Sequence, residues 1–507
     1  MLVKSKTSFA STILVFIILV SGCGSNPNNN TDEISYLITI DKSDHKLARV
    51  KVSFSSKDSL LYMNRGANQL PKRWATFVHN VMVKNSTGKS ILVEELPDAK
   101  WKMSVAPNEK ITLTYEVKLD HEDYKWDGGI DGAAYAKDWG VFYTGRALLI
   151  LNGDEWKNIR VDFSLPQDWN VTTPWKVSND NKNSFKVNNM SELAESMIFA
   201  GLHQEISIVR DDFELVFALG GAEIIAQKDE FKKLAEGVLD YYIDLMGGIP
   251  KPSFGNKLEK VVVIINSSSF TDGEVIGNNI SILIEKNPDQ MSKIISRFII
   301  AHELFHLWNG KSFAPANDDA EWFKEGFTNY YTLKSLHHVG FLDDLSYLGV
   351  LNNLFFQRYN NDDGTGKLSM TMGEEKHAHW GLIYGGGLFV AISQDLIIRN
   401  ATKNKKSIDD LMRSLFQKYG ATNDSYSIDD LLNSLSKLSG IDQAEFFNSY
   451  VTGIHRIPIT EYLSPAGLSA KIEKGNLIIT KKDNLNPLQQ NILNGFFGIH
   501  DSSIIDR

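Results

Sequence analysis

The first part of the chain alternates between apolar and polar side chains. Between residues 111 and 119 every second position is apolar. Because successive side chains of a β-strand point to opposite faces of a sheet, this alternation predicts a strand with one buried face. Turn sequences, such as residues 85–88 and 152–153, separate further short runs of the same kind. We therefore predict that residues 34–209 form an antiparallel β domain of the sandwich type.

The pattern changes from strand-like to helical in the middle of the chain. Residues 229–246 carry apolar side chains three and four positions apart, which is the spacing of one face of an α-helix. Two short apolar runs, at residues 260–265 and 280–284, predict buried strands. A long helix is predicted next, with Asn287 as its N-cap and Pro288 at its first helical position.

Helical patterns continue to about residue 453, and two of the helices share a start signal. Ser407 and Ser427 each open the pentapeptide Ser-Ile-Asp-Asp-Leu, in which serine is a favourable N-cap and the acids lie in the first turn. We assign residues 210–459 to one mainly helical domain. The tail, residues 460–507, is marginal as an independent domain, so we expect it to pack on the helical domain.

The chain opens with an export signal. Two lysines precede the apolar run at residues 13–20, and small residues follow this run before Cys23. The run is too short to span a membrane as a stable helix. Residues 20–23, Val-Ser-Gly-Cys, resemble the lipobox of bacterial lipoproteins. The resemblance implies that residues 1–22 are removed and that Cys23 is lipidated, which gives stable membrane anchoring.

Cys23 is the only cysteine of the chain, and its position at the end of the leader favours the lipoprotein over an ordinary secretory signal. After Cys23, the stretch up to residue 33 contains nothing that could be buried, so residues 23–33 are expected to be the lipidated cysteine and a flexible tether. We therefore expect an exported, membrane-anchored lipoprotein of the bacterial cell envelope.

The composition is that of an ordinary folded protein. Of 507 residues, 42% are hydrophobic and 23% are charged. This length exceeds what one hydrophobic core usually serves, so two or three domains are expected. The formal net charge is -9 and the folded part has no run of Lys and Arg. Nucleic acid is therefore not expected as a partner, because binding it needs a concentrated positive patch.

The long predicted helix ends in the motif His302-Glu-Leu-Phe-His306. Two histidines four residues apart on a helix point the same way, so both imidazoles can reach one metal ion. A catalytic zinc takes a third protein ligand and keeps one position open for water. Glu325, in the next predicted helix, can complete the site, and Glu303 can reach its open side. The alternative is a pair of exposed helix histidines that bind no metal.

These segments look like a known family. Residues 302–309 (HELFHLWN) and 322–331 (WFKEGFTNYY) resemble the glycyl aminopeptidase family, which belongs to the gluzincins, the zinc peptidases with HExxH and a later glutamate. Residues 384–399 and 446–453 are also similar, and the similarity covers roughly residues 34–462. It implies an N-terminal β domain, a thermolysin-like, mainly helical zinc peptidase domain, and one zinc ion per chain.

The resemblance also implies roles for single residues. Matched position by position, it makes His302, His306 and Glu325 the metal ligands, Glu303 the catalytic base and Tyr384 the stabiliser of the oxyanion. The expected function is zinc-dependent hydrolysis of peptide or protein substrates outside the cytoplasm, by an aminopeptidase. Two alternatives stay open: a metallo-endopeptidase, and a lipid-anchored binding protein with a vestigial zinc site.

The chain departs from the family pattern in two places. Family members usually carry a glutamate in a Gly-Gly-Leu-Glu-His stretch, which is thought to hold the free amine of the substrate. Aligned on Asn279, that position holds Ile276 here, and the nearby acid Glu274 is the candidate that could replace it. The family also usually ends in a PDZ domain, for which residues 460–507 are too short.

Overall fold

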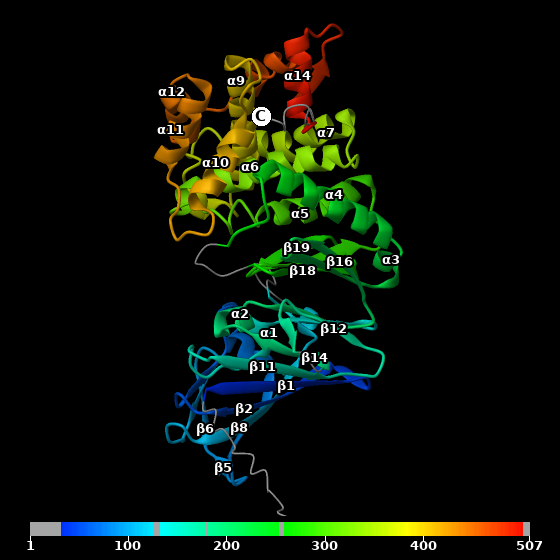
Figure 1. Cartoon of the computed structure of the whole chain (residues 1–507), viewed down its shortest axis with the longest axis vertical. Helices are drawn as coiled ribbons and strands as arrows, with labels where there is room; N and C mark the ends of the chain where they lie inside the picture. The colour runs from blue at the N-terminus through cyan, green and yellow to red at the C-terminus, as the bar shows by residue number, and fades with distance from the viewer. Residues whose placement is uncertain (1–31, 125–131, 179–180, 253–257, 500–507) are drawn as a thin grey trace, which may run out of the picture.

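The computed structural model describes residues 32–124, 132–178, 181–252 and 258–499. Three β-sheets and a layer of helices are stacked along the long axis of the molecule (Figure 1). The predicted leader, Cys23 and the tether up to residue 31 lie outside the described residues.

The first layer is an eight-stranded sheet with the order β13-β14-β11-β1-β2-β8-β4-β5. Its strands are β1 Glu33–Asp41, β2 Asp44–Ser55, β4 Val78–Asn85, β5 Ser90–Ile91, β8 Lys110–Lys118, β11 Asn158–Ser164, β13 Lys176–Ser178 and β14 Asn181–Val187. Neighbours are antiparallel except for β1 and β11, which are parallel. In β8 buried positions alternate with more exposed ones, as the sequence predicts.

The second layer is a four-stranded sheet that is apolar on both faces. It has the order β12-β15-β10-β9 and consists of β9 Tyr135–Lys137, β10 Gly140–Thr144, β12 Asn170–Thr172 and β15 Met197–Gly201. Val141 and Tyr143 pack toward the first sheet, whereas Phe142 between them packs toward the third. A small sheet of β3 Leu60–Tyr62, β6 Val93–Leu96 and β7 Lys100–Met103 completes this domain. The predicted β-sandwich is thus confirmed.

The third layer is a five-stranded sheet with the order β16-β17-β18-β20-β19. Its strands are β16 Gln204–Arg210, β17 Phe213–Gly220, β18 Lys260–Ser268, β19 Asp272–Ile276 and β20 Asn279–Glu285. The central strands β17, β18 and β20 are parallel neighbours. Both faces of these strands are covered, which explains their continuous apolar runs. Because β16 belongs to this sheet, the sheet begins at residue 204, before the predicted domain limit at residue 209.

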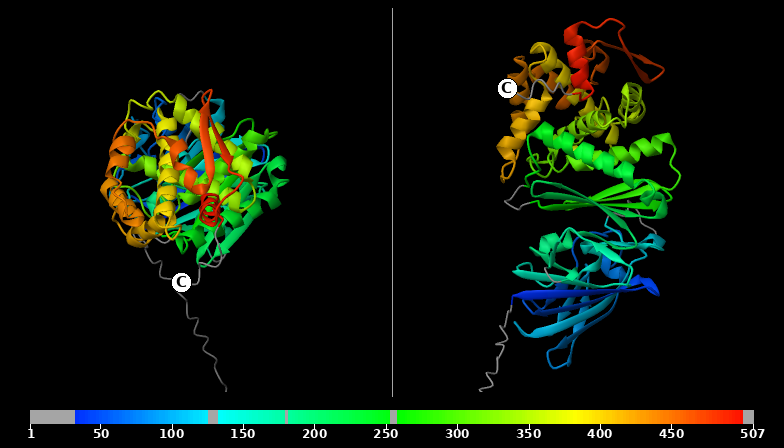
Figure 2. Two further views of the ribbon diagram at one scale, coloured as in Figure 1. Left: turned by 90° about the horizontal axis from the view of Figure 1, so that it is seen from above. Right: turned by 45° about the vertical axis from the view of Figure 1, so that its right-hand side comes forward.

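Helices cover the other face of the third sheet (Figure 2). Those that contact its strands are α3 Ala222–Ile225, α4 Lys228–Met246 and α5 Gln290–Phe305. Further helices pack on these: α6 Glu321–His338, α7 Asp344–Val350, α8 Gln357–Asn361, α9 Gly386–Ala401, α10 Ile408–Tyr419 and α11 Ile428–Ser439. Two short helices, α1 Gly145–Leu148 and α2 Met190–Ala194, lie in the β domain. The β-rich domain followed by a mainly helical one confirms the predicted fold class.

The start of α5 differs from the prediction, while two other predicted helix starts are confirmed. The Asp289 carboxylate accepts a hydrogen bond from the backbone N–H of Ser292 at 2.7 Å, so Asp289 is the N-cap. The prediction of Asn287 as the cap is wrong, because this bond places Pro288 before the helix. Ser407 and Ser427 are the N-caps that the sequence predicts, and each also forms a capping box with the aspartate three residues later.

The tail packs on the helical domain, as its length predicts. It consists of α13 Ile459–Tyr462, the hairpin β21 Leu468–Glu473 and β22 Asn476–Lys481, and α14 Pro487–Phe496. The hydroxyls of Tyr330 and Tyr347 donate hydrogen bonds to the carbonyl oxygen of Phe496 at 3.4 and 3.1 Å. Among the described residues, one helical stretch, Gly381–Ala401, is long and apolar enough to cross a membrane, but it lies in the core with 89% of its most apolar window buried.

Helices α6 and α9 cross at two glycines. A Cβ atom on Gly326 would overlap the backbone of Gly387, and a Cβ on Gly387 would overlap the carbonyl group of Trp322. The two backbones are therefore as close as only glycine permits. Glu325 precedes Gly326, and Tyr384 lies three residues before Gly387, so the crossing brings these two candidate site residues together.

Replacing either glycine by alanine is expected to destabilise the protein. Alanine is normally better than glycine inside a helix by about 1 kcal/mol. Here the added methyl group has no room, and overpacking of this kind costs about 1–3 kcal/mol or more. Gly326→Ala and Gly387→Ala should each lower the thermal unfolding midpoint by several degrees. Gly349→Ala in α7 is the control, because no atom lies within 4 Å of its added Cβ. Unchanged midpoints for the first two variants would contradict the tight crossing.

Candidate metal centre

His302, His306 and Glu325 meet at one point. The end of α5 supplies the two histidines, and α6 supplies the glutamate. The two Nε2 atoms are 3.0 Å apart, and Oε2 of Glu325 lies 3.3 Å from Nε2 of His302 and 3.2 Å from Nε2 of His306. Ligands about 2.0–2.1 Å from a tetrahedral zinc ion are about 3.3 Å from one another. The three predicted ligands therefore have the donor set and the spacing of a zinc site.

Backbone contacts and aromatic stacking hold the histidine rings. Nδ1 of His306 lies 2.8 Å from the carbonyl oxygen of Asn309. This nitrogen therefore carries the ring proton, which leaves Nε2 free to bind a metal. The ring of His302 stacks with those of Phe298 and Tyr384, with centroid distances of 6.1 and 6.4 Å. Both imidazoles are thus oriented before any ion binds.

The Glu325 carboxylate is ionised despite its burial. Burial alone would raise its pKa, but the neighbouring His306 and His302 lower that pKa well below its ordinary value. The resulting negative charge suits a cation. In Glu303, which follows His302 on α5, burial raises the pKa above its ordinary value; the neighbouring His302 opposes this rise and Glu325 adds to it. A carboxylate with a raised pKa is the stronger base.

Tyr384 lies beside the metal triangle on η7 Gly381–Gly385, a π-helical turn that leads into α9. Its ring stacks on Trp380 at a centroid distance of 5.0 Å and an interplanar angle of 7°. Its carbonyl oxygen accepts a hydrogen bond from Nδ2 of Asn329 on α6, at 3.2 Å. Burial, and then the charge of Glu325, raise the pKa of the Tyr384 hydroxyl, so this group stays protonated and can donate a hydrogen bond.

Glu274 and Ile276 lie on the face of β19 that is turned toward the β domain. Alternate residues of a strand share a face, and Gly273, which precedes Glu274 and so lies on the opposite face, is directly against Ile299 of α5. Oε2 of Glu274 accepts a hydrogen bond from the backbone N–H of Gly132 at 2.5 Å. Ile276 is 2% exposed and belongs to the apolar cluster between the second and third sheets. The predicted amine-binding glutamate thus already has a protein partner.

A second group of possible metal-binding side chains, His379, Asp362 and Asp363, forms hydrogen bonds within the protein. Nδ1 of His379 lies 3.0 Å from Oδ1 of Asp362 and 3.3 Å from Oδ1 of Asp363. Asp362 also accepts hydrogen bonds from the backbone N–H groups of Gly364 at 2.9 Å and Leu382 at 3.1 Å. The group therefore ties a loop to the start of the turn that carries Tyr384.

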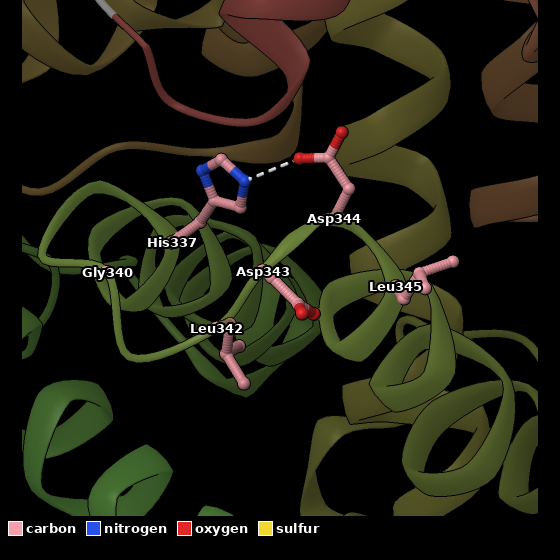
Figure 3. A pocket seen from close by; sticks show the side chains of 6 residues that line it. All are labelled: His337, Gly340, Leu342, Asp343, Asp344 and Leu345. Carbon is pink, nitrogen blue, oxygen red and sulfur yellow. Dashed lines mark hydrogen bonds and ion pairs between the residues drawn. The ribbon is translucent and has the colours of Figure 1, made fainter.

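The pocket drawn in Figure 3 is remote from the metal triangle. It has a volume of about 400 Å³ and is lined by His337, Gly340, Leu342, Asp343, Asp344 and Leu345. Nε2 of His337 lies 2.9 Å from Oδ1 of Asp344, at hydrogen-bond distance, across it (Figure 3). His337 is twelve residues from Glu325 on α6, which is about 18 Å at 1.5 Å per residue.

Sequence reasoning missed several residues that support the site. Trp380 precedes Tyr384 by four positions, and this helical spacing could have revealed the stacked pair. Asn309 follows the histidine motif closely and could have been suspected as its backbone partner. Lys376 contacts Glu325 from a distant loop, and no local pattern indicates that contact.

Two parts of the chain match known peptidase domains. Residues 35–202 match the N-terminal domain of peptidase family M61, and residues 271–450 match the peptidase family M1 domain. The second match spans the metal triangle, Glu303 and Tyr384. No curated protein matches the chain.

Solved structures show the same fold. The chain is similar to an aminopeptidase N family protein from Idiomarina loihiensis, with 19% sequence identity and a TM-score of 0.70 over 87% of this chain and 79% of that chain. It is also similar to a mutant of the M1 zinc metallopeptidase from Deinococcus radiodurans, with 11% identity and a TM-score of 0.51 over 85% of this chain and 95% of that chain.

The geometry assigns different roles to the two glutamates near the histidines. We expect the protein from residue 24 onward to hold about one zinc ion per chain. Glu325→Ala should lose most of this zinc, because it removes a ligand atom, whereas Glu303→Gln should keep it, because Glu303 is outside the triangle. Metal analysis after dialysis checks both. Zinc loss in Glu303→Gln with retention in Glu325→Ala would reverse the assignment.

Proposed function

We propose that the chain is a zinc metallopeptidase of the gluzincin type, which hydrolyses peptide bonds outside the cytoplasm at the site formed by His302, His306 and Glu325. The matches to an M61 N-terminal domain and to an M1 peptidase domain support this proposal. The observation that carries this proposal is the triangle of their ligand atoms, with sides of 3.0, 3.2 and 3.3 Å. Glu303 and Tyr384 supply the remaining functional groups.

Each residue of the site has a separate role in hydrolysis. A bound zinc ion would polarise the peptide carbonyl and lower the pKa of water. Glu303 accepts the proton of the attacking water and then delivers it to the leaving amine nitrogen. The Tyr384 hydroxyl donates a hydrogen bond to the developing oxyanion, an interaction that is stronger in the transition state than in the ground state. This complete set argues against a binding protein with a vestigial site.

For the recognition of the N-terminal end of the substrate we propose aminopeptidase specificity, with Glu274 as the group that binds the free amine. A cationic amine that is buried without a carboxylate partner is unfavourable, and Glu274 on β19 is the acid near the position taken by Ile276. An endopeptidase is the second candidate. It is favoured by the burial of Ile276 and by the hydrogen bond that ties Glu274 to Gly132.

Paired peptides with free and acetylated N-termini test the proposal. Chelation of zinc and the Glu303→Gln substitution should both abolish cleavage of every peptide. Glu274→Ala should lower kcat/KM about 10- to 100-fold on free-amine peptides, which is the effect of losing a hydrogen bond to a charged group, and should leave acetylated peptides unaffected. The measurement is a digest of a peptide mixture read by mass spectrometry.

Asp272→Ala is the matched control for Glu274→Ala, because Asp272 is an exposed acid on the same strand. It should behave as wild type. Equal cleavage of free and acetylated peptides by the wild-type enzyme would refute the aminopeptidase and leave the endopeptidase. Cleavage that survives complete removal of zinc would refute the peptidase mechanism itself.

We also propose that Cys23 anchors the enzyme to a membrane of the cell envelope. The apolar run and the Val-Ser-Gly-Cys sequence at residues 20–23 support this. Wild-type protein should incorporate labelled fatty acid in its bacterial host. Cys23→Ser should incorporate none and keep residues 1–22, because lipidation precedes cleavage in this pathway; Ser25→Ala should behave as wild type. A wild-type protein that matures without the label would leave only an ordinary secretory signal.

A further inference from the structure

The two oxygens of the Glu325 carboxylate have different neighbours. Oε2 faces the histidines, at 3.3 Å from Nε2 of His302 and 3.2 Å from Nε2 of His306. Oε1 faces two lysines, at 3.2 Å from Nζ of Lys376 and 3.6 Å from Nζ of Lys324. The carboxylate is thus held from the side opposite to the metal triangle.

A second glutamate holds the same two lysines. Glu321 lies one turn before Glu325 on α6, and its Oε2 is 2.5 Å from Nζ of Lys376. Its other oxygen, Oε1, pairs with Lys324. Both glutamates are buried, and like charges four residues apart on a helix repel each other. The two ammonium groups compensate this repulsion, because each lies within 4 Å of a carboxylate oxygen of both glutamates.

The backbone, and not only the side chain, places Lys376. This residue directly follows η6 Gly373–Glu375, a short 3-10 helix. A Cβ on Gly373 would overlap the carbonyl oxygen of Asp318 and lie 2.8 Å from Cβ of Glu321. The loop therefore docks on the start of α6 at a distance that only glycine allows. This backbone contact places Lys376 next to Glu325.

We propose that Lys376 is a positioning residue that fixes the metal ligand Glu325. The inference rests on the proposed zinc site. A carboxylate can bind a metal ion through one oxygen or through both, and a second oxygen would occupy the position that a catalytic zinc keeps open for water. The ammonium group of Lys376 holds Oε1 away from the metal, so that Oε2 alone is presented. Lys324 has the longer contact with Oε1 and contributes mainly by pairing with Glu321.

Substitution of Lys376 by methionine tests this role, because methionine keeps much of the side-chain length and removes the charge. Partners of metal ligands typically contribute 10- to 100-fold to metal affinity. Lys376→Met is therefore expected to raise the dissociation constant for zinc by about this factor, as measured by competition with a chromogenic chelator. In cobalt-loaded protein the visible absorption should weaken, because a second carboxylate oxygen raises the coordination number.

Two further variants separate positioning from a general effect on folding. Lys437→Met is the matched control: Lys437 is exposed on α11 and makes no ion pair among the described residues. It should leave both readouts unchanged. In the double variant Glu321→Gln with Lys376→Met, the buried carboxylate that would keep only one of its two lysine partners is also neutralised. Any loss of stability from Lys376→Met should be relieved, while the zinc affinity stays low.

The outcomes distinguish this inference from the proposed function. If wild-type protein binds no zinc, the proposed function fails. If wild-type protein binds zinc, and Lys376→Met has the same zinc affinity and the same cobalt spectrum, the role of Lys376 is overturned while the zinc site stands. Wild-type affinity in the double variant would equally overturn it, because the loss in Lys376→Met would then come from the uncompensated charge of Glu321.

Discussion

The close crossing of α6 and α9 is the constraint on which the site depends. At Gly326 and Gly387 the two backbones touch, so neither helix can rotate or slide without a clash. This fixed contact sets the position of Glu325 relative to Tyr384, and the hydrogen bond from Asn329 to the backbone of Tyr384 reinforces it. The histidines of α5 then need only one further packing contact, that between α5 and α6, to complete the site.

The site also concentrates negative charge in a buried place. Glu303, Glu321 and Glu325 lie on two adjacent helices, and burying such groups is unfavourable unless each has a partner. Lysines from a loop and from α6 serve Glu321 and Glu325, while no lysine lies within ion-pair distance of Glu303 in the described part of the chain. The base is thus the carboxylate whose environment raises its pKa, and the ligand is the one whose pKa is lowered.

Local sequence patterns were enough to predict the features that depend on neighbouring residues. The four-residue spacing of His302 and His306 predicts their convergence, and strand alternation predicts the β-sandwich. The start of α5 was missed because the sequence offers two capping residues within three positions, Asn287 and Asp289, and the second of them caps the helix. The role of Tyr384 was predicted only from a family resemblance, and the contact of Lys376 with Glu325 was not predicted at all. Contacts between segments that are distant in the sequence leave no periodic pattern in it.

The four-stranded sheet has a consequence for the integrity of the whole molecule. Its side chains, among them Phe142 and Phe199, form a shared cluster with Val262 and Ile264 of the third sheet, so the border between the two domains is itself a hydrophobic core. Domains joined in this way do not hinge freely. Either half, produced alone, would expose this apolar face to water and aggregate, so each domain depends on the other for its solubility.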